Sequence, residues 1–155
     1  MTVISGSHLR RLNWLGPAGG IIHPFCERTE CSGMTYGLSY AGYDIRIKQT
    51  LFLEPGDFQL ASTIERFQIP LNLVAVLHDK SSWARQGIAV QNTVFEPGWR
   101  GHATLEISNH SKELAMITEG DPIGQVMFHM LSEPLDVGYD GKYQDQEDTP
   151  VPVKF

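Results

Sequence analysis

The sequence has few of the features that mark secreted, membrane-spanning or nucleic-acid-binding proteins. Its 155 residues include only two cysteines, too few for a disulfide framework. No apolar run approaches the ~18 to 20 residues that a membrane-spanning helix needs, and the first residues lack the apolar core of a signal peptide. The net charge of −6 disfavours a nucleic-acid polymer as partner, because tracking phosphates needs clustered Lys and Arg. We expect a cytoplasmic protein without membrane or nucleic-acid partners.

Long helical patterns are also scarce, and no internal repeat appears. Fifteen Gly and nine Pro in 155 residues favour an all-β architecture, and the length fits a single domain over residues 1–155. Residues 1–20 look irregular, and we expect them to form an arm across a neighbouring subunit. A short helical turn is expected within 21–31. The composition of residues 132–155 is polar and acidic, which by itself indicates a disordered tail.

The strand signals are short apolar or alternating runs bounded by turn residues. We expect strands at 58–63, 73–77, 87–90, 94–95, 114–117 and 123–130. In this interpretation 91–93 is the turn of a tight hairpin between 87–90 and 94–95, and 96–101 is a second turn.

Residues 103–109 alternate strictly, which is typical of a strand with one buried face. The pattern puts Ala103, Leu105 and Ile107 on one face and Thr104, Glu106 and Ser108 on the other. Glutamate has poor strand propensity, so Glu106 is either an ordinary solvent-facing residue or a carboxylate aimed into a polar cleft.

Residues 80–87 combine a short helix signal with groups that can bind anions. Ser81 is the expected N-cap and Gly87 ends the helix. Free N–H groups at the helix start, Lys80, and the hydroxyls of Ser81 and Ser82 could together bind phosphate. Arg85 would share a face with Ser81. The alternative is a plain surface helix with a solvated Arg85.

Several separated motifs resemble, in order and spacing, those of the dCTP deaminases, which share their fold with the trimeric dUTPases. These motifs are KSSWARQG, FEPGWRGHATLEISN, IGQVMF and YDGKYQDQ, with HPF at 23–25 and TYGLSYAGYDIRI at 35–47 further upstream. The resemblance covers roughly residues 20 to 150. It implies a distorted jelly-roll-like β-barrel of the trimeric dUTPase type with short helices, a strand pair at 36–47, and a homotrimer with sites at subunit interfaces. It also implies that residues 132–155 form a lid that closes over the nucleotide.

The same resemblance assigns roles to individual residues. It implies a hydrolytic deamination of dCTP to dUTP and ammonia, with Glu106 as general acid and base and with Ser81 and Arg85 as further catalytic residues. The implied substrate-binding residues are Lys80, Ser82, Trp83, Ala84, Thr93, Glu96, Trp99, Thr104, Leu105, Gln125, Tyr139, Lys142 and Gln146.

The sequence gives only weak evidence for a metal site. His23, Cys26 and Cys31 form an H-x2-C-x4-C pattern, but the H-x-E and P-C-x-x-C signature of zinc-dependent nucleobase deaminases is absent. We expect reduced thiols, no protein-held metal and no zinc. Mg²⁺ would be bound through the nucleotide triphosphate.

Three other functions stay open at this point. A bifunctional enzyme that takes dCTP to dUMP would use both Glu106 and Glu96. A dUTPase is the second possibility, because AlaGlyTyrAsp at 41–44, Glu96 and Trp99 resemble motifs of that branch. The third is a nucleotide-binding regulator without turnover, which the joint presence of Ser81, Arg85 and Glu106 disfavours.

Overall fold

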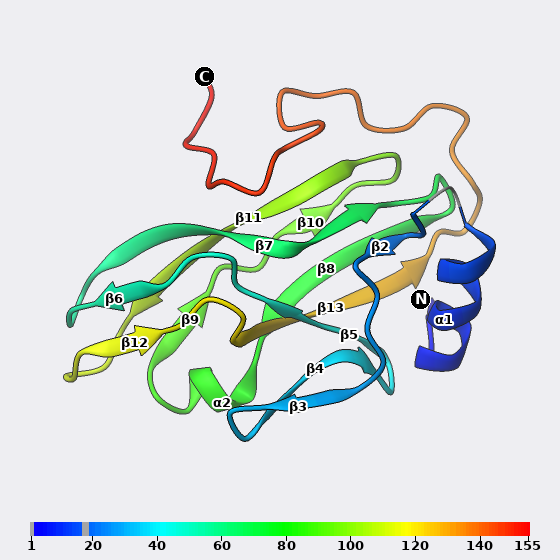
Figure 1. The fold of residues 1–155 in the computed structure, drawn as a ribbon. Coiled ribbons are helices and arrows are strands. Elements are labelled where there is room, and N and C mark those ends of the chain that lie inside the picture. Colours follow the sequence, from blue (N-terminus) through cyan, green and yellow to red (C-terminus); the bar gives the residue numbers. More distant parts are fainter. Residues whose placement is uncertain (1, 17–18) are drawn as a thin grey trace.

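The computed structural model describes residues 2–16 and 19–155 and shows a fold built mainly of antiparallel β-strands (Figure 1). Strands hold 45% of the residues and helices 9%, so the prediction of an all-β protein is confirmed. No helix among the described residues is long and apolar enough to cross a membrane.

Two larger sheets and one small one make up the fold. The seven-stranded sheet has the order β10-β8-β13-β5-β4-β3, with β1 paired to β13. Its strands are β1 (Thr2–Val3), β3 (Thr29–Cys31), β4 (Met34–Ser39), β5 (Gly42–Arg46), β8 (Leu73–Asp79), β10 (Val94–Phe95) and β13 (Pro122–Met130). The four-stranded sheet consists of β2 (Ile22–His23), β7 (Phe58–Gln68), β11 (Arg100–Asn109) and β9 (Ile88–Val90). The small sheet pairs β6 (Leu51–Leu53) with β12 (Ala115–Ile117).

The core contains apolar side chains from both larger sheets. The odd-numbered positions of β11, Ala103, Leu105 and Ile107, are buried, whereas Glu106 is half-buried on the opposite face. The alternation predicted for this strand is therefore confirmed. It places the Glu106 carboxyl outside the core but not in open solvent.

The prediction that residues 1–20 are irregular is wrong for the described residues. Residues 2–16 form β1 and the helix α1 (Gly6–Leu15), whose N-cap Ser5 accepts a hydrogen bond from the backbone N–H of His8. Leu9 is fully buried in the core of its own chain, and the contact of this segment with a neighbouring subunit stays a prediction. The remainder of the expected irregular segment includes residues 17 and 18, which lie outside the described residues.

The helical turn expected within 21–31 is also wrong. This segment forms β2 and β3 instead. Ile22 of β2 is fully buried beside Phe67 of β7, to which it pairs, and a local pattern cannot show this distant contact. Strand β3 pairs with the adjacent strand β4, with Cys31 opposite Met34.

The hairpin predicted around 91–93 does not form. Strand β9 pairs with β11 in one sheet, whereas β10 pairs with β8 in the other. Residues 91–93 therefore connect the two sheets. The backbone N–H of Gln91 donates to Glu106 O and the N–H of Leu77 donates to Thr93 O, which fixes both ends of the connection.

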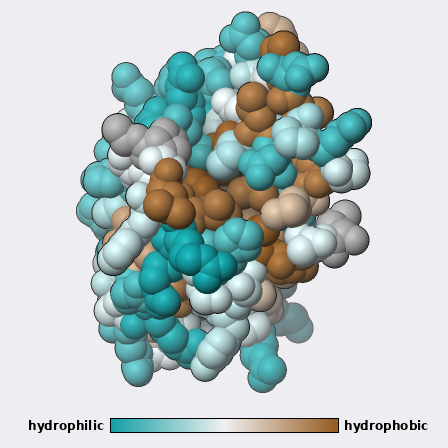
Figure 2. All heavy atoms as spheres, turned by 90° about the vertical axis from the view of Figure 1, so that its right-hand side faces the viewer, coloured by the Kyte–Doolittle hydropathy of each residue, from teal (hydrophilic) through white to brown (hydrophobic). Residues whose placement is uncertain are grey.

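Apolar side chains also reach the surface beside α1 (Figure 2). The exposed apolar residues here belong to β1, to β13 and to the loop after β13. They are Val3, Met130, Leu135 and Val137. From this loop the chain runs back over β11 to the C-terminus (Figure 1). The composition of residues 132–155 indicates disorder, whereas the structure docks their later part against β11.

Candidate active site

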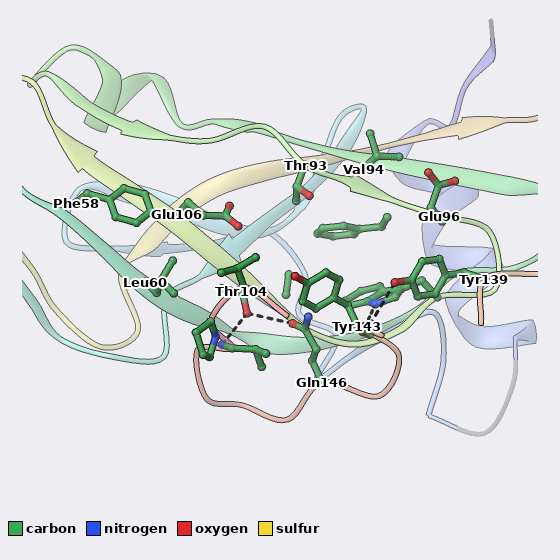
Figure 3. Close-up of a pocket in the computed structure, with 16 residues that line it drawn as sticks. Phe58, Leu60, Thr93, Val94, Glu96, Thr104, Glu106, Tyr139, Tyr143 and Gln146 are labelled. Atoms are coloured by element: carbon green, nitrogen blue, oxygen red, sulfur yellow. Dashed lines mark hydrogen bonds between the residues drawn. The ribbon is translucent and has the colours of Figure 1, made fainter. Parts of the chain in front are cut away.

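A cavity of about 680 Å³ lies between β11, the β10 segment and the C-terminal tail (Figure 3). Strand β7 contributes apolar walls, β11 contributes polar side chains, and the tail closes the outer side. The lining residues are Phe58, Leu60, Thr93, Val94, Phe95, Glu96, Trp99, Ala103, Thr104, Glu106, Tyr139, Tyr143, Gln146, Val151, Pro152 and Val153. The cavity is large enough for a nucleotide-sized ligand.

Glu106 lies at one end of this cavity, beside Phe58 and Leu60 of β7 (Figure 3). Leu60 is its cross-strand neighbour in the β7–β11 ladder. Burial raises the pKa of the Glu106 carboxyl above its usual range. A carboxyl group with a raised pKa can accept and return a proton near neutral pH, which is what a general acid and base must do.

The other end of the cavity holds a second carboxylate, Glu96, close to Tyr139 of the tail (Figure 3). The buried ring of Trp99 also lines the cavity and packs on Phe95 with ring centroids 5.1 Å apart. The Trp99 indole N–H donates to Tyr143 O at 2.7 Å. The cavity thus offers an aromatic wall and a carboxylate at each end.

The tail is fastened to the cavity wall through Thr104. The Thr104 hydroxyl donates to Gln146 Oε1 at 3.1 Å and accepts from the backbone N–H of Val151 at 3.1 Å. Lys142 is exposed and does not line the cavity, and its ammonium donates to Lys154 O. Tyr139 and Gln146 therefore face the cavity, while Lys142 lies outside it.

The segment with Ser81 and Arg85 lies outside this cavity. The helix α2 (Ser81–Ala84) is at the opposite side of the molecule from the tail (Figure 1). Its N-cap is Lys80, without a side-chain capping bond, so the prediction of Ser81 as N-cap is wrong. The helix ends before Gly87, whose φ of 83° suits glycine, as expected.

The structure therefore separates the predicted site residues into two groups. The cavity brings together Thr93, Glu96, Trp99, Thr104, Glu106, Tyr139 and Gln146. Outside it are Lys80, Ser81, Ser82, Trp83, Ala84, Arg85, Leu105, Gln125 and Lys142. The side chains of Leu105 and Trp83 are buried in the core, and the Trp83 indole N–H donates to Pro122 O at 2.7 Å. Neither side chain lines this cavity, and their roles as substrate contacts stay predictions.

Lys80 is engaged in an ion pair with Asp44 of β5. The Lys80 ammonium lies 2.9 Å from Asp44 Oδ2, and the two side chains are only 11% and 8% exposed. Asp44 also accepts hydrogen bonds from Thr35 and Gln125, each at 3.1 Å, and Gln125 donates to Ser39 as well at 3.0 Å. This buried polar network ties α2 to the seven-stranded sheet.

Some site residues were not predicted from the sequence. Tyr143 lines the cavity and lies within the YDGKYQDQ motif, so its position in that motif could have indicated it. Phe58 and Leu60 carry no chemical signal of their own. Only the β7–β11 register reveals that they flank Glu106.

His23, Cys26 and Cys31 do not gather in the structure. Among residues 2–16 and 19–155, no three His, Cys, Asp or Glu side chains are close enough to hold a metal ion. The Cys26 sulfur accepts a long hydrogen bond from Arg46 at 3.9 Å, and Cys31 is a free thiol in β3.

Comparison with known proteins decides the family. A model of the dCTP deaminase-like family matches residues 41–131. A dCTP deaminase of Campylobacter fetus subsp. fetus is 37% identical over 165 residues, which cover 85% of this chain and 89% of that protein. The chain belongs to the dCTP deaminase-like family. A dCTP deaminase of Campylobacter lari is also 37% identical, over 180 residues that cover 93% of this chain and 97% of that protein. Membership of the dCTP deaminase-like family supports dCTP deaminase activity in general terms.

Solved structures confirm the predicted fold. The EIAV dUTPase superposes with a TM-score of 0.57 at 19% identity, covering 76% of this chain and 94% of that one. The dUTPase from phage phi11 of S. aureus, in which a structural Mg(II) ion is coordinated, gives 0.55 at 18% identity and covers 77% and 93%. At these identities the likeness to the dUTPases shows the fold of this dCTP deaminase-like chain and nothing finer.

Proposed function

We propose that the protein hydrolyses dCTP to dUTP and ammonia, with Glu106 as general acid and base and without zinc. The observation that carries this proposal is the Glu106 carboxyl, which is half-buried at the apolar end of a nucleotide-sized cavity and has a raised pKa.

The chemistry needs one group that both takes and gives protons. Water adds to C4 of the cytosine ring, a proton reaches N3, and the C4–N bond breaks as ammonia leaves with a further proton. Glu106 accepts the proton of the attacking water and passes it to the base. The apolar flank formed by Phe58 and Leu60 favours this exchange, because burial disfavours the charged carboxylate and so raises its pKa.

The rest of the cavity fits the rest of the nucleotide. Thr93 and Thr104 lie beside Glu106, and the Thr93 hydroxyl would bind the base, whereas the Thr104 hydroxyl holds Gln146 of the tail in place (Figure 3). Trp99 would pack against the deoxyribose, and Glu96 would bind its hydroxyl. Gln146 on the tail would contact the bound nucleotide from the outer side.

The triphosphate would lie toward the outer, tail side of the cavity. Lys142 would reach it by releasing Lys154 O. Mg²⁺ belongs to the substrate in this proposal, since triphosphate oxygens and waters are its preferred ligands.

Ser81 and Arg85 enter the mechanism only if a second subunit supplies them. Arg85 is exposed and follows directly after α2, which lies at the opposite side of the molecule from the tail that closes the cavity. A closed ring of three identical subunits would repeat one heterologous interface and could bring α2 of one subunit to the cavity of the next. We therefore propose a homotrimer with its sites at the interfaces, where Ser81 holds the attacking water and Arg85 steadies Glu106.

A bifunctional enzyme that forms dUMP is the second candidate. It is favoured by Glu96, an exposed carboxylate at the far end of the same cavity, where it could activate a second water at the phosphate chain. A dUTPase without deaminase activity would use Glu96 and leave Glu106 without a reaction.

Incubation with dCTP and, separately, with dUTP tests these candidates, with the nucleotide products separated by ion-exchange chromatography. The proposal predicts dUTP and ammonia from dCTP. Formation of dUMP from both substrates would establish the bifunctional enzyme. Turnover of dUTP alone would contradict the deaminase proposal.

The shared site has its own test. Glu106→Gln and Arg85→Ala proteins are each expected to be inactive, and they are mixed in equal amounts under conditions that exchange subunits. In randomly mixed trimers, one site in about four receives an intact Glu106 and an intact Arg85 from two different subunits. Recovery of about a quarter of the wild-type activity supports interface sites. No recovery despite proven exchange contradicts them.

A further inference from the structure

The tail segment 143–146 runs alongside the first residues of β11. The backbone N–H of Asp145 donates to Arg100 O, and that of His102 donates to Gln146 O, both at 2.9 Å. Gly101 and Gln146 form a parallel β-bridge between these two bonds. A Cβ on Gly101 would lie 2.7 Å from Gln146 N, so only glycine permits this approach.

An ion pair reinforces this backbone contact. Arg100 Nε and Nη2 donate to the two carboxylate oxygens of Asp145 at 2.6 and 2.8 Å, and Arg66 Nη2 lies 3.5 Å from Asp145 Oδ1. Paired N–H donors facing both oxygens are the strongest geometry of an Arg–carboxylate contact. The hydrogen bonds from Arg100 lower the pKa of the Asp145 carboxyl.

The backbone at Asp145 is in a left-handed conformation, with φ of 57°. Asp adopts this region more readily than most residues other than glycine, but the region is sparsely populated and needs support from its surroundings. The turn at Asp145 sets the direction of the next residue, Gln146, and of the preceding Tyr143. Both of these side chains line the cavity (Figure 3).

We propose that Asp145, fastened by Arg100, is a positioning residue that holds Tyr143 and Gln146 against the substrate cavity. It does not touch the cavity itself. Its effect on catalysis rests on the proposed function, whereas its effect on the docking of the tail does not. The two effects can therefore be measured separately.

The size of the effect expected on tail docking follows from the exposure of the Arg100–Asp145 ion pair. Exposed ion pairs contribute little, and loss of one with good geometry changes an equilibrium about two- to fivefold. The backbone bonds remain when the charges are removed. The tail should therefore detach more often in the variants without being lost altogether.

The first readout is tryptic cleavage after Lys142 in the absence of nucleotide, followed by mass spectrometry of the released residues 143–155 and, after a second cut at Lys154, 143–154. Cleavage there reports the fraction of molecules with a detached tail. Arg100→Gln and Asp145→Asn should each accelerate cleavage about two- to fivefold, and the double variant no more than the stronger single one. Glu27→Gln is the matched control, because Glu27 and Arg10 form an equally exposed two-point pair, at 2.7 and 2.6 Å, in which Arg10 belongs to α1.

The second readout is steady-state kinetics with dCTP. A positioning role predicts that both variants raise KM by about the same factor by which they accelerate tryptic cleavage. Added salt should raise KM less in the variants than in wild type, because the variants lack the ion pair that salt screens. Wild-type cleavage rates in both single variants, or independent additive effects in the double variant, would overturn the proposal. A wild-type protein that docks its tail but releases no ammonia from dCTP would refute the proposed function and leave this inference standing.

Discussion

Replacing Lys80 by Met should destabilise the protein, because it breaks the buried pair with Asp44. The change removes the ammonium and leaves the Asp44 carboxylate, which is 8% exposed, without its cationic partner. Removing one member of a buried ion pair typically costs about 3 to 5 kcal/mol. Thr35 and Gln125 still donate to Asp44 in the variant, which places the expected loss near the lower end, about 3 kcal/mol.

Urea unfolding at one fixed protein concentration measures this loss, since the apparent stability of an assembling protein depends on concentration. With the usual urea dependence of about 1 to 3 kcal/mol per molar, the midpoint should fall by about 1 to 3 M. Asp44→Asn combined with Lys80→Met should recover much of the loss, because no buried charge is left unpaired. Lys112→Met, at an exposed position, is the control.

The sequence motif alone implies a different outcome, in which Lys80 is a phosphate ligand whose loss raises KM. If Lys80→Met unfolds at the wild-type urea concentration and changes only KM, the ion pair contributes nothing and the reasoning from the structure is refuted. A stability loss with a secondary loss of activity would instead mark Lys80 as the residue that anchors α2.

Three further predictions concern the cavity and the tail. Burial raises the pKa of Glu106 in the folded state, so its contribution to stability is present at low pH and is lost as the pH rises through that pKa. Glu106→Gln should therefore raise Tm relative to wild type at about pH 8 but not at about pH 4. Equal Tm differences at both pH values would contradict the raised pKa. Ending the chain at Val137 removes Tyr139 and Gln146 from the cavity. We expect kcat/KM to fall steeply while sedimentation still gives a trimer. A truncated protein with the wild-type kcat/KM would show that the tail is not needed for turnover. Glu96→Gln should leave ammonia release intact, and if wild type yields dUMP, product analysis should show dUTP instead; unchanged dUMP would exclude Glu96 as the second base.

The strands that could be predicted are those whose periodicity is decided locally. Residues 103–109 alternate because one face of β11 meets the core, and this pattern also placed Glu106 on the face opposite the core. The short strand β2 could not be predicted, since Ile22 is held by Phe67, 45 residues further along the chain. Strand β3 was missed although its partner β4 follows directly, with Cys31 paired to Met34. The same holds for residues 91–93, where the pattern shows two strands but not that they belong to different sheets.

The candidate site was predicted as a set of residues but not as an arrangement. Motif order connects Ser81, Arg85 and Glu106 along the sequence, and it cannot show that the first two lie outside the cavity that Glu106 lines. The partner of Lys80 was missed for a similar reason, because Asp44 lies 36 positions away and the pairing depends on sheet topology.

The central claim is that Glu106 carries the protons of deamination, and ammonia release from dCTP by the Glu106→Gln protein tests it most directly. Gln keeps the size and the hydrogen-bonding reach of the side chain but cannot act as a base. We predict that the rate falls by about 10² to 10⁴ while dCTP binding, measured by calorimetry, is retained. Ammonia release at the wild-type rate would contradict the account.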